Sequence, residues 1–253
     1  MNRTLCAVMM TLLAAGLVAQ AGLAAPQEGS FPPVDLSKLR PADFNDNELD
    51  LPFHLLHFHR LAGSVLMDGP DRGFITLPIW RPANGNKPYN ARIMESILSL
   101  AFFYATDRPW NSYYGSPALR ARLEAALEFW CRVQAPDGKF SEYSPQGWNL
   151  AATAFATKFM GQTLTLLSKG PAIDKDLHRR VFEADRKALR IVFTDDGLRK
   201  HGRKYSNQYS NAFAGALAFL ELNPDPELEK LLRLRVEEAS RDHQSPAGFF
   251  YEA

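Results

Sequence analysis

Residues 149–167 read NLAATAFATKFMGQTLTLL, and residues 174–193 read DKDLHRRVFEADRKALRIVF. Both stretches fit an α-helix, but the first contains one charged side chain, Lys158, whereas the second contains ten. A helix that is apolar on every side must be buried on every side, whereas a helix rich in charge keeps one face in water. The contrast therefore predicts a buried inner helix followed by a half-exposed outer helix.

The same alternation continues on both sides of this pair. Inner helices are predicted over Asn90–Ala105, Asn149–Leu167 and Asn207–Leu222, and outer helices over Pro117–Gln134, Asp174–Phe193 and Pro226–Asp242. The outer helices begin at positions 117, 174 and 226, so the repeat is 57 and then 52 residues long. We therefore expect an all-α fold: an incomplete (α/α) toroid of about three helical hairpins in two concentric layers.

Two segments precede the repeats. Residues 1–24 have the order of a secretory signal peptide, with a basic start, an apolar run over Leu5–Val18 and small residues up to Ala24. Residues 25–89 form an irregular lead with one predicted helix, Leu51–Met67, and a short strand candidate, Phe74–Trp80, in a loop rich in Pro and Gly. The toroid portion then covers residues 90–253.

Charge and cysteine content restrict the class of protein. The chain has 29 Lys and Arg residues against 28 Asp and Glu residues, which argues against binding nucleic acid through bulk charge. The signal peptide predicts a secreted or periplasmic protein without stable membrane insertion after cleavage. Cleavage removes Cys6, so Cys131 has no disulfide partner, and its place on an amphipathic helix predicts a buried structural thiol.

The starts of the three inner helices are similar in sequence. All inner helices of a toroid run in the same direction, so their N-termini surround one opening. The aromatic and amide side chains predicted there are Tyr89, Asn90, Trp148, Asn149, Tyr205, Asn207, Gln208, Tyr209 and Asn211, and the cations are Lys87, Arg92, Lys200, His201, Arg203 and Lys204. This set suits a hydroxyl-rich anionic ligand. Helix capping alone explains Asn90 and Asn149 equally well.

Three segments resemble heparinase II/III-type polysaccharide lyases: residues 108–115 (RPWNSYYG), 134–140 (QAPDGKF) and 205–211 (YSNQYSN). The Gln-x-x-x-Gly-x-Phe element of the second segment also occurs in other α/α toroids, where it fastens helices. The resemblance implies β-elimination on glycans that contain uronic acids, with no metal or other cofactor expected. It implies that Asn207 neutralises the substrate carboxylate and that Tyr205 or Tyr209 transfers a proton.

The resemblance also implies groups that this sequence lacks. Residues 246–252 (PAGFFYE) look like an Asp-Gly-x-x-x-Glu segment that precedes the catalytic Tyr in these lyases. That Tyr, a later His and a β-sandwich domain have no counterpart before Ala253. We therefore expect the N-terminal part of a longer enzyme, in which the last inner helix lacks a neighbour on one side.

Two other functions remain open. A glycoside hydrolase on the same scaffold needs two carboxylates, for which the candidates are Glu95, Glu221, Glu142 and Asp137. A glycan-binding protein without catalytic activity needs neither these acids nor Asn207. His54, His57 and His59 are interpreted as polar positions of an amphipathic helix, because no acidic or Cys ligand has the spacing of a metal site.

Overall fold

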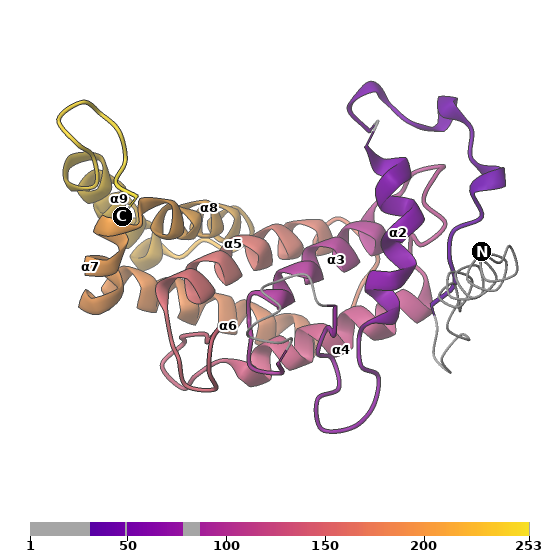
Figure 1. The fold of residues 1–253 in the computed structure, drawn as a ribbon, viewed down its shortest axis with the longest axis horizontal. Coiled ribbons are helices and arrows are strands. Elements are labelled where there is room, and N and C mark those ends of the chain that lie inside the picture. Colours follow the sequence, from indigo (N-terminus) through magenta and orange to yellow (C-terminus); the bar gives the residue numbers. More distant parts are fainter. Residues whose placement is uncertain (1–30, 49, 78–86, 253) are drawn as a thin grey trace, which may run out of the picture. The chain divides into compact units, whose positions relative to one another are not determined.

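A computed structural model describes residues 31–48, 50–77 and 87–252, so the predicted signal peptide lies outside the described residues. The described chain is all-α, as predicted, and contains no strand (Figure 1). The α-helices are α2 (Leu51–Gly63), α3 (Ile97–Ala105), α4 (Pro117–Val133), α5 (Leu150–Leu167), α6 (Lys175–Thr194), α7 (Asp196–Lys204), α8 (Ser206–Leu222) and α9 (Pro226–Asp242). Short 3-10 helices cover Leu36–Lys38, Pro41–Asp43, Asp46–Glu48 and Ile93–Ser96.

The helices from α3 to α9, α7 apart, form two layers. Helix α5 contacts both α3 and α8, and in the other layer α6 contacts both α4 and α9. Helices α3, α5 and α8 each contact the charged helix that follows in the opposite layer, namely α4, α6 and α9. The alternation of charge along the sequence therefore assigned each of these helices to the correct layer.

Helices α5 and α8 approach each other more closely than side chains normally allow. A Cβ atom added to Gly215 of α8 would lie 2.8 Å from the backbone carbon and oxygen of Thr157 in α5. A Cβ atom on Gly161, one turn further along α5, would lie 3.1 Å from the Cβ atom of Ala218, which also comes later in α8. Contacts that advance together along both helices show that α5 and α8 are parallel.

Helix α3 runs in the same direction as α5. Near their starts, the backbone N–H of Ala91 donates to the carbonyl of Ser141 at 2.9 Å. Near their ends, the Tyr104 hydroxyl donates to the carbonyl of Ala172 at 3.1 Å. Since all three inner helices are parallel, their N-termini lie at one edge of the layer.

The Gln-x-x-x-Gly-x-Phe element fastens the two layers. The Gln134 side-chain amide donates to the carbonyl of Ala184 in α6 at 2.7 Å and to that of Gly138 at 3.0 Å. Gly138 has a φ of 103° and lies so close to α6 that an added Cβ would be 2.8 Å from the carbonyl oxygen of Lys187. Phe140 then stacks on Trp130, with 4.7 Å between ring centroids. This element is therefore structural.

The segment 108–115 is structural as well. The Asn111 amide donates to the carbonyls of Phe103 and Thr106, both at 2.7 Å, and so binds free carbonyls at the end of α3. The neighbouring Trp110 is completely buried. Of the three segments that resemble the lyases, only 205–211 remains as a candidate for chemistry.

Four sequence-based boundaries need correction. Helix α2 ends at Gly63, because Val65 and Ile75 pair in a single antiparallel bridge. The described part of the strand candidate Phe74–Trp80 forms this bridge and backbone hydrogen bonds with Ser64 and Leu66, but no strand. The first inner α-helix begins at Ile97, after the 3-10 turn Ile93–Ser96. Helix α7 was missed, because Asp195–Gly197 reads as a turn; in the structure Asp195 caps α7 through the N–H of Leu198 at 2.8 Å.

Burial supports the structural interpretation of Cys131. Its thiol is free and partly buried among the outer helices, and burial raises its pKa to about 11. At neutral pH this group is therefore a thiol and not a thiolate. None of the described helices is long and apolar enough to cross a membrane.

The side of α8 and α9 that faces away from the other hairpins remains open. Leu217 and Val236 are exposed there, and both line a groove of about 650 Å³ between the two helices. The sequence predicted that the last inner helix lacks a neighbour on one side, and among the described residues Leu217 of that helix is exposed.

The contact between α5 and α8 can be tested by substitution. We expect Gly215→Ala to lower the free energy of unfolding by about 1–3 kcal/mol, because the new methyl group would overlap the Thr157 backbone. Chemical denaturation followed by circular dichroism measures this value. Gly63→Ala is the matched control, since its Cβ would meet nothing closer than 3.6 Å. Equal stabilities for the two variants would contradict the close contact.

We expect Asp185 to make the free energy of unfolding depend on pH. It is completely buried in α6, neither carboxylate oxygen has a hydrogen-bond partner, and burial raises its pKa well above the usual value. The folded state therefore retains the proton, so the contribution of Asp185 to stability is greatest below its unfolded pKa and is lost as the pH rises.

We therefore expect Asp185→Asn to raise the melting temperature relative to wild type more at pH 8 than at pH 4. Thermal unfolding across this range is the measurement. The control Asp176→Asn changes an exposed carboxylate of the same helix and should give no such trend. Parallel curves for wild type and Asp185→Asn would show that Asp185 is not a buried neutral acid.

Candidate functional site

The starts of α3, α5 and α8 form what we call the N-terminal edge, which comprises residues 87–95, 139–149 and 195–211. Each segment is placed by the parallel packing of the inner helices. Helix α7 adds its basic residues to the same edge, because it contacts the start of α5 and is followed directly by α8. The edge therefore collects most of the predicted ligand-binding side chains.

At the start of α8, a carboxylate of the protein occupies the helix N-terminus. The turn at residues 244–252 folds back on α8, where Glu252 pairs with Tyr205 in an antiparallel bridge. The Glu252 carboxylate accepts a hydrogen bond from the backbone N–H of Asn207 at 2.7 Å. This contact shows that the first turn of α8 offers free N–H groups to an anion, as expected for a helix N-terminus.

The amide side chain of Asn207 is available to a ligand. Asn207 is exposed, and its side chain makes no hydrogen bond within the described chain. Its carbonyl accepts from the side-chain amide of Asn211, one turn later, at 2.5 Å. Gln208 is partly exposed beside it. The side-chain amides of Asn207, Gln208 and Asn211 therefore lie together. Those of Asn207 and Gln208 make no hydrogen bond within the described chain.

An aromatic pair borders this amide cluster. The rings of His201 and Tyr205 stack at 4.5 Å, with an angle of 27° between their planes. His201 is exposed and Tyr205 partly exposed, so both can meet a molecule from solvent. Arg203, in the last turn of α7, is exposed as well. The start of α8 therefore combines amides, imidazole, phenol and positive charge within two helical turns.

Tyr209 does not belong to this exposed group. It is 1% exposed, its ring contacts Phe193 and Phe213, and its hydroxyl is buried without a partner. Burial also raises its pKa strongly, which disfavours a phenolate. This position excludes proton transfer between Tyr209 and a polysaccharide, and it corrects the catalytic role predicted from the sequence.

The start of α5 contributes one exposed aromatic ring. Asn149 is the N-cap of α5, and its side-chain oxygen accepts from the N–H of Ala152 at 2.8 Å. Its capping function therefore occupies that oxygen. Trp148 is 37% exposed, and Tyr89 is partly exposed with its hydroxyl 3.4 Å from the carbonyl of Tyr143. Of the aromatic residues predicted at this opening, Trp148 is the one that the structure leaves most exposed.

Two predicted ligand-binding residues are buried. Asn90 is 2% exposed, and its side-chain oxygen accepts from the N–H of Arg92 at 3.0 Å. The Arg92 side chain forms an ion pair with Glu95 and lies 4.0 Å from the centre of the Phe155 ring. Because both polar groups are engaged inside the protein, the predicted contacts of Asn90 and Arg92 with substrate are corrected to structural roles.

Beside Arg92 lie two acids, the buried Glu142 and the partly buried Glu95, whose proximity sequence reasoning missed. Glu142 is 2% exposed, and its charge acts on Glu95. Burial raises the pKa of Glu95 to about 7, although the charge of Arg92 opposes this effect. The only signal in the sequence was the presence of both acids just before or at the start of an inner helix. Their closeness follows from the contact between residues 91 and 141.

The described residues contain no group of three His, Cys, Asp or Glu side chains placed to bind a metal ion. His54 and His57 line a cavity between α2 and α3, away from the N-terminal edge. The predicted site residues thus separate into an accessible cluster at the start of α8, an exposed Trp148 and a buried group around Arg92.

Comparison of this chain with protein-family models, with curated proteins and with solved structures finds no match. The assignment of function therefore rests on the geometry of the N-terminal edge.

Proposed function

We propose that this protein is a secreted, lyase-like protein that acts by β-elimination on glycans containing uronic acids, with the start of α8 as its reactive site. The observation that carries the proposal is the position of Asn207. Its exposed amide is unpaired and adjoins a helix N-terminus that already binds the carboxylate of Glu252 at 2.7 Å. The main-chain N–H of Asn207 binds the carboxylate of Glu252, and we infer that the carboxylate of a uronic acid replaces Glu252 there.

Charge around this position favours an acidic ligand. Lys200, His201, Arg203 and Lys204 of α7 are exposed beside Asn207, and the described residues offer Lys200 and Lys204 no ion-pair partner. The dipole of α8 adds partial positive charge at the same point. Together these groups raise the local concentration of an anionic polysaccharide.

The groups suit the steps of β-elimination. Asn207 donates hydrogen bonds to the C5 carboxylate, which acidifies the C5 proton. Tyr205, or His201 stacked on it, accepts that proton as the double bond forms between C4 and C5. The C4–O bond breaks, and the departing glycosidic oxygen takes a proton from the other member of the pair. Exposed Trp148 supplies a stacking surface for a neighbouring sugar.

The two layers also support the proposal that the fold is part of an (α/α) toroid. The inner helices are parallel, and each contacts the following outer helix, as such a fold requires. The open side of α8 and α9, with Leu217 exposed, is the position that a further hairpin would cover.

Asn207→Ala tests the lyase proposal. We expect the variant to lose at least about 100-fold in the rate of product formation, because the carboxylate of the carbanion-like transition state loses its donor. Incubation with a uronic-acid polysaccharide, followed by the ultraviolet absorbance of the unsaturated product, measures this rate. Asn223→Ala, an exposed amide at the other end of α8, is the matched control. Unchanged rates in Asn207→Ala would eliminate its assigned role.

A second function, glycoside hydrolysis, is favoured by one observation. Glu95 has a pKa near 7, as a general acid requires, and a second carboxylate, Glu142, lies near it. Glu142 is nevertheless buried, and Glu95 is only partly exposed and paired with Arg92. The lyase proposal is therefore better supported, because Asn207 is more exposed to a substrate than Glu95 and Glu142 are.

Glu95→Gln distinguishes the two functions. We expect it to leave β-elimination within about threefold of wild type, because Glu95 plays no part in proton transfer at Asn207. Glu227→Gln, which changes an exposed acid of α9, is the control. If wild type releases sugar ends without ultraviolet absorbance, and Glu95→Gln abolishes that release, the protein is a hydrolase.

A further inference from the structure

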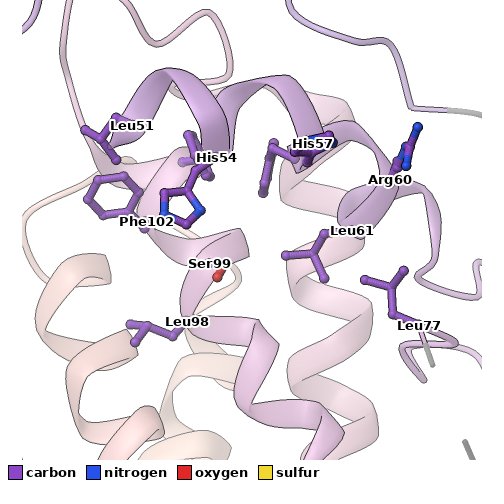
Figure 2. Close-up of a pocket in the computed structure, with 11 residues that line it drawn as sticks. Leu51, His54, His57, Arg60, Leu61, Leu77, Leu98, Ser99 and Phe102 are labelled. Carbon is purple, nitrogen blue, oxygen red and sulfur yellow. The ribbon is translucent and has the colours of Figure 1, made fainter. Parts of the chain in front are cut away.

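A cavity of about 590 Å³ lies between α2 and α3 and shares no residue with the N-terminal edge. Figure 2 shows its described lining, in which Leu51 and Leu61 of α2 face Leu98 and Phe102 of α3. Cavities that bind small molecules commonly have volumes of about 300–1,000 Å³ and mainly apolar walls. The size and the walls of this cavity are therefore those of a binding site for an apolar molecule.

The polar groups of the cavity lie on one side of α2. His54, His57 and Arg60 follow one another at intervals of three residues, so they occupy neighbouring positions along the helix. In Figure 2 the imidazole of His54 lies beside Phe102 and above Ser99 of α3, whereas Arg60 stands at the rim beyond Leu61. The apolar walls thus end in a rim that carries imidazole, hydroxyl and guanidinium groups.

Within the part of the chain that the structure describes, the rings of His54 and His57 contact the ring of Phe53. Across the described chain, neither His54 nor Ser99 makes a side-chain hydrogen bond, and Arg60 forms no ion pair. Other arginines near this region are paired, as Arg72 is with Glu128 and Arg108 with Glu48. No acidic side chain is among the described lining residues. The rim therefore carries one positively charged side chain, Arg60, beside imidazole and hydroxyl groups that a ligand can reach from solvent.

We propose that this cavity binds an amphipathic organic anion, namely a medium-chain fatty acid or a molecule of the same chemistry. The leucine and phenylalanine walls bury the hydrocarbon chain, and the carboxylate lies at the rim, where His54 and Ser99 donate hydrogen bonds and Arg60 supplies charge. A sugar fits poorly, because its hydroxyl groups would face apolar walls. The proposal does not depend on the function of the N-terminal edge.

Titration calorimetry with decanoate, below the concentration at which it forms micelles, tests the proposal on the full chain. We expect saturable binding with one site per protein, and at least tenfold weaker binding of decanol, which lacks the charge. The double variant His54→Ala with Arg60→Gln should lower the affinity for decanoate at least tenfold and leave the affinity for decanol unchanged. Both residues are exposed, so this variant should fold.

Two further variants complete the test. Ser99→Phe places a ring in the cavity and should abolish binding of both ligands, whereas Arg233→Gln, an exposed change on α9, should alter neither. Absence of saturable decanoate binding to wild type would overturn the proposal. Equal affinity for decanoate and decanol would overturn the proposal that the rim binds a carboxylate. A change of oligomeric state in the double variant, without decanoate binding to wild type, would identify a second copy of the chain as the occupant.

Discussion

The close contact of α5 and α8 is the constraint on which the rest of the structure depends. Gly215 has no side chain, and the Thr157 backbone occupies the space where a Cβ would lie. The two helices can therefore pack backbone to backbone around Thr157 and Gly215, and Ala154, Ala212 and Ala216 are completely buried. This packing makes α8 parallel to α5 and brings the start of α8 to the same edge as Trp148 and Asn149. Without it, the amides of α8 would not share an edge with the other inner helices.

Much of the fold follows from the sequence, because charged side chains remain in water and helices without charge are buried. Lys158 is the single charge of α5, whereas α6 carries ten from its N-cap onward, and this difference assigned the layers correctly. The starts of α4, α5 and α9 were also predictable, because Ser116, Asn149 and Asp225 are strong N-caps followed by helix formers. What the sequence did not show was α7, since Asp195–Gly197 suits a turn and a helix N-terminus equally well.

The site was only partly predictable, for a related reason. Tyr205 and Tyr209 are four residues apart and look equivalent in the sequence, yet one is accessible and the other is in the core. The difference comes from Gly202 of α7, where an added Cβ would lie 2.7 Å from the ring of Tyr209. A helix that was not predicted thus provides the place in which Tyr209 is buried. Likewise, the pairing of Arg92 with Glu95 and the nearness of Glu142 depend on contacts between two inner helices.

Binding of an acidic glycan at the N-terminal edge, against the start of α8, can be measured by hydrogen exchange followed by mass spectrometry, with and without an oligosaccharide of uronic acids. We expect slower exchange in peptides that contain residues 200–211 and 143–150, with no change in α2 or at the open side of α9. Slower exchange confined to α2 and α3, or unchanged exchange at residues 200–211, would contradict it.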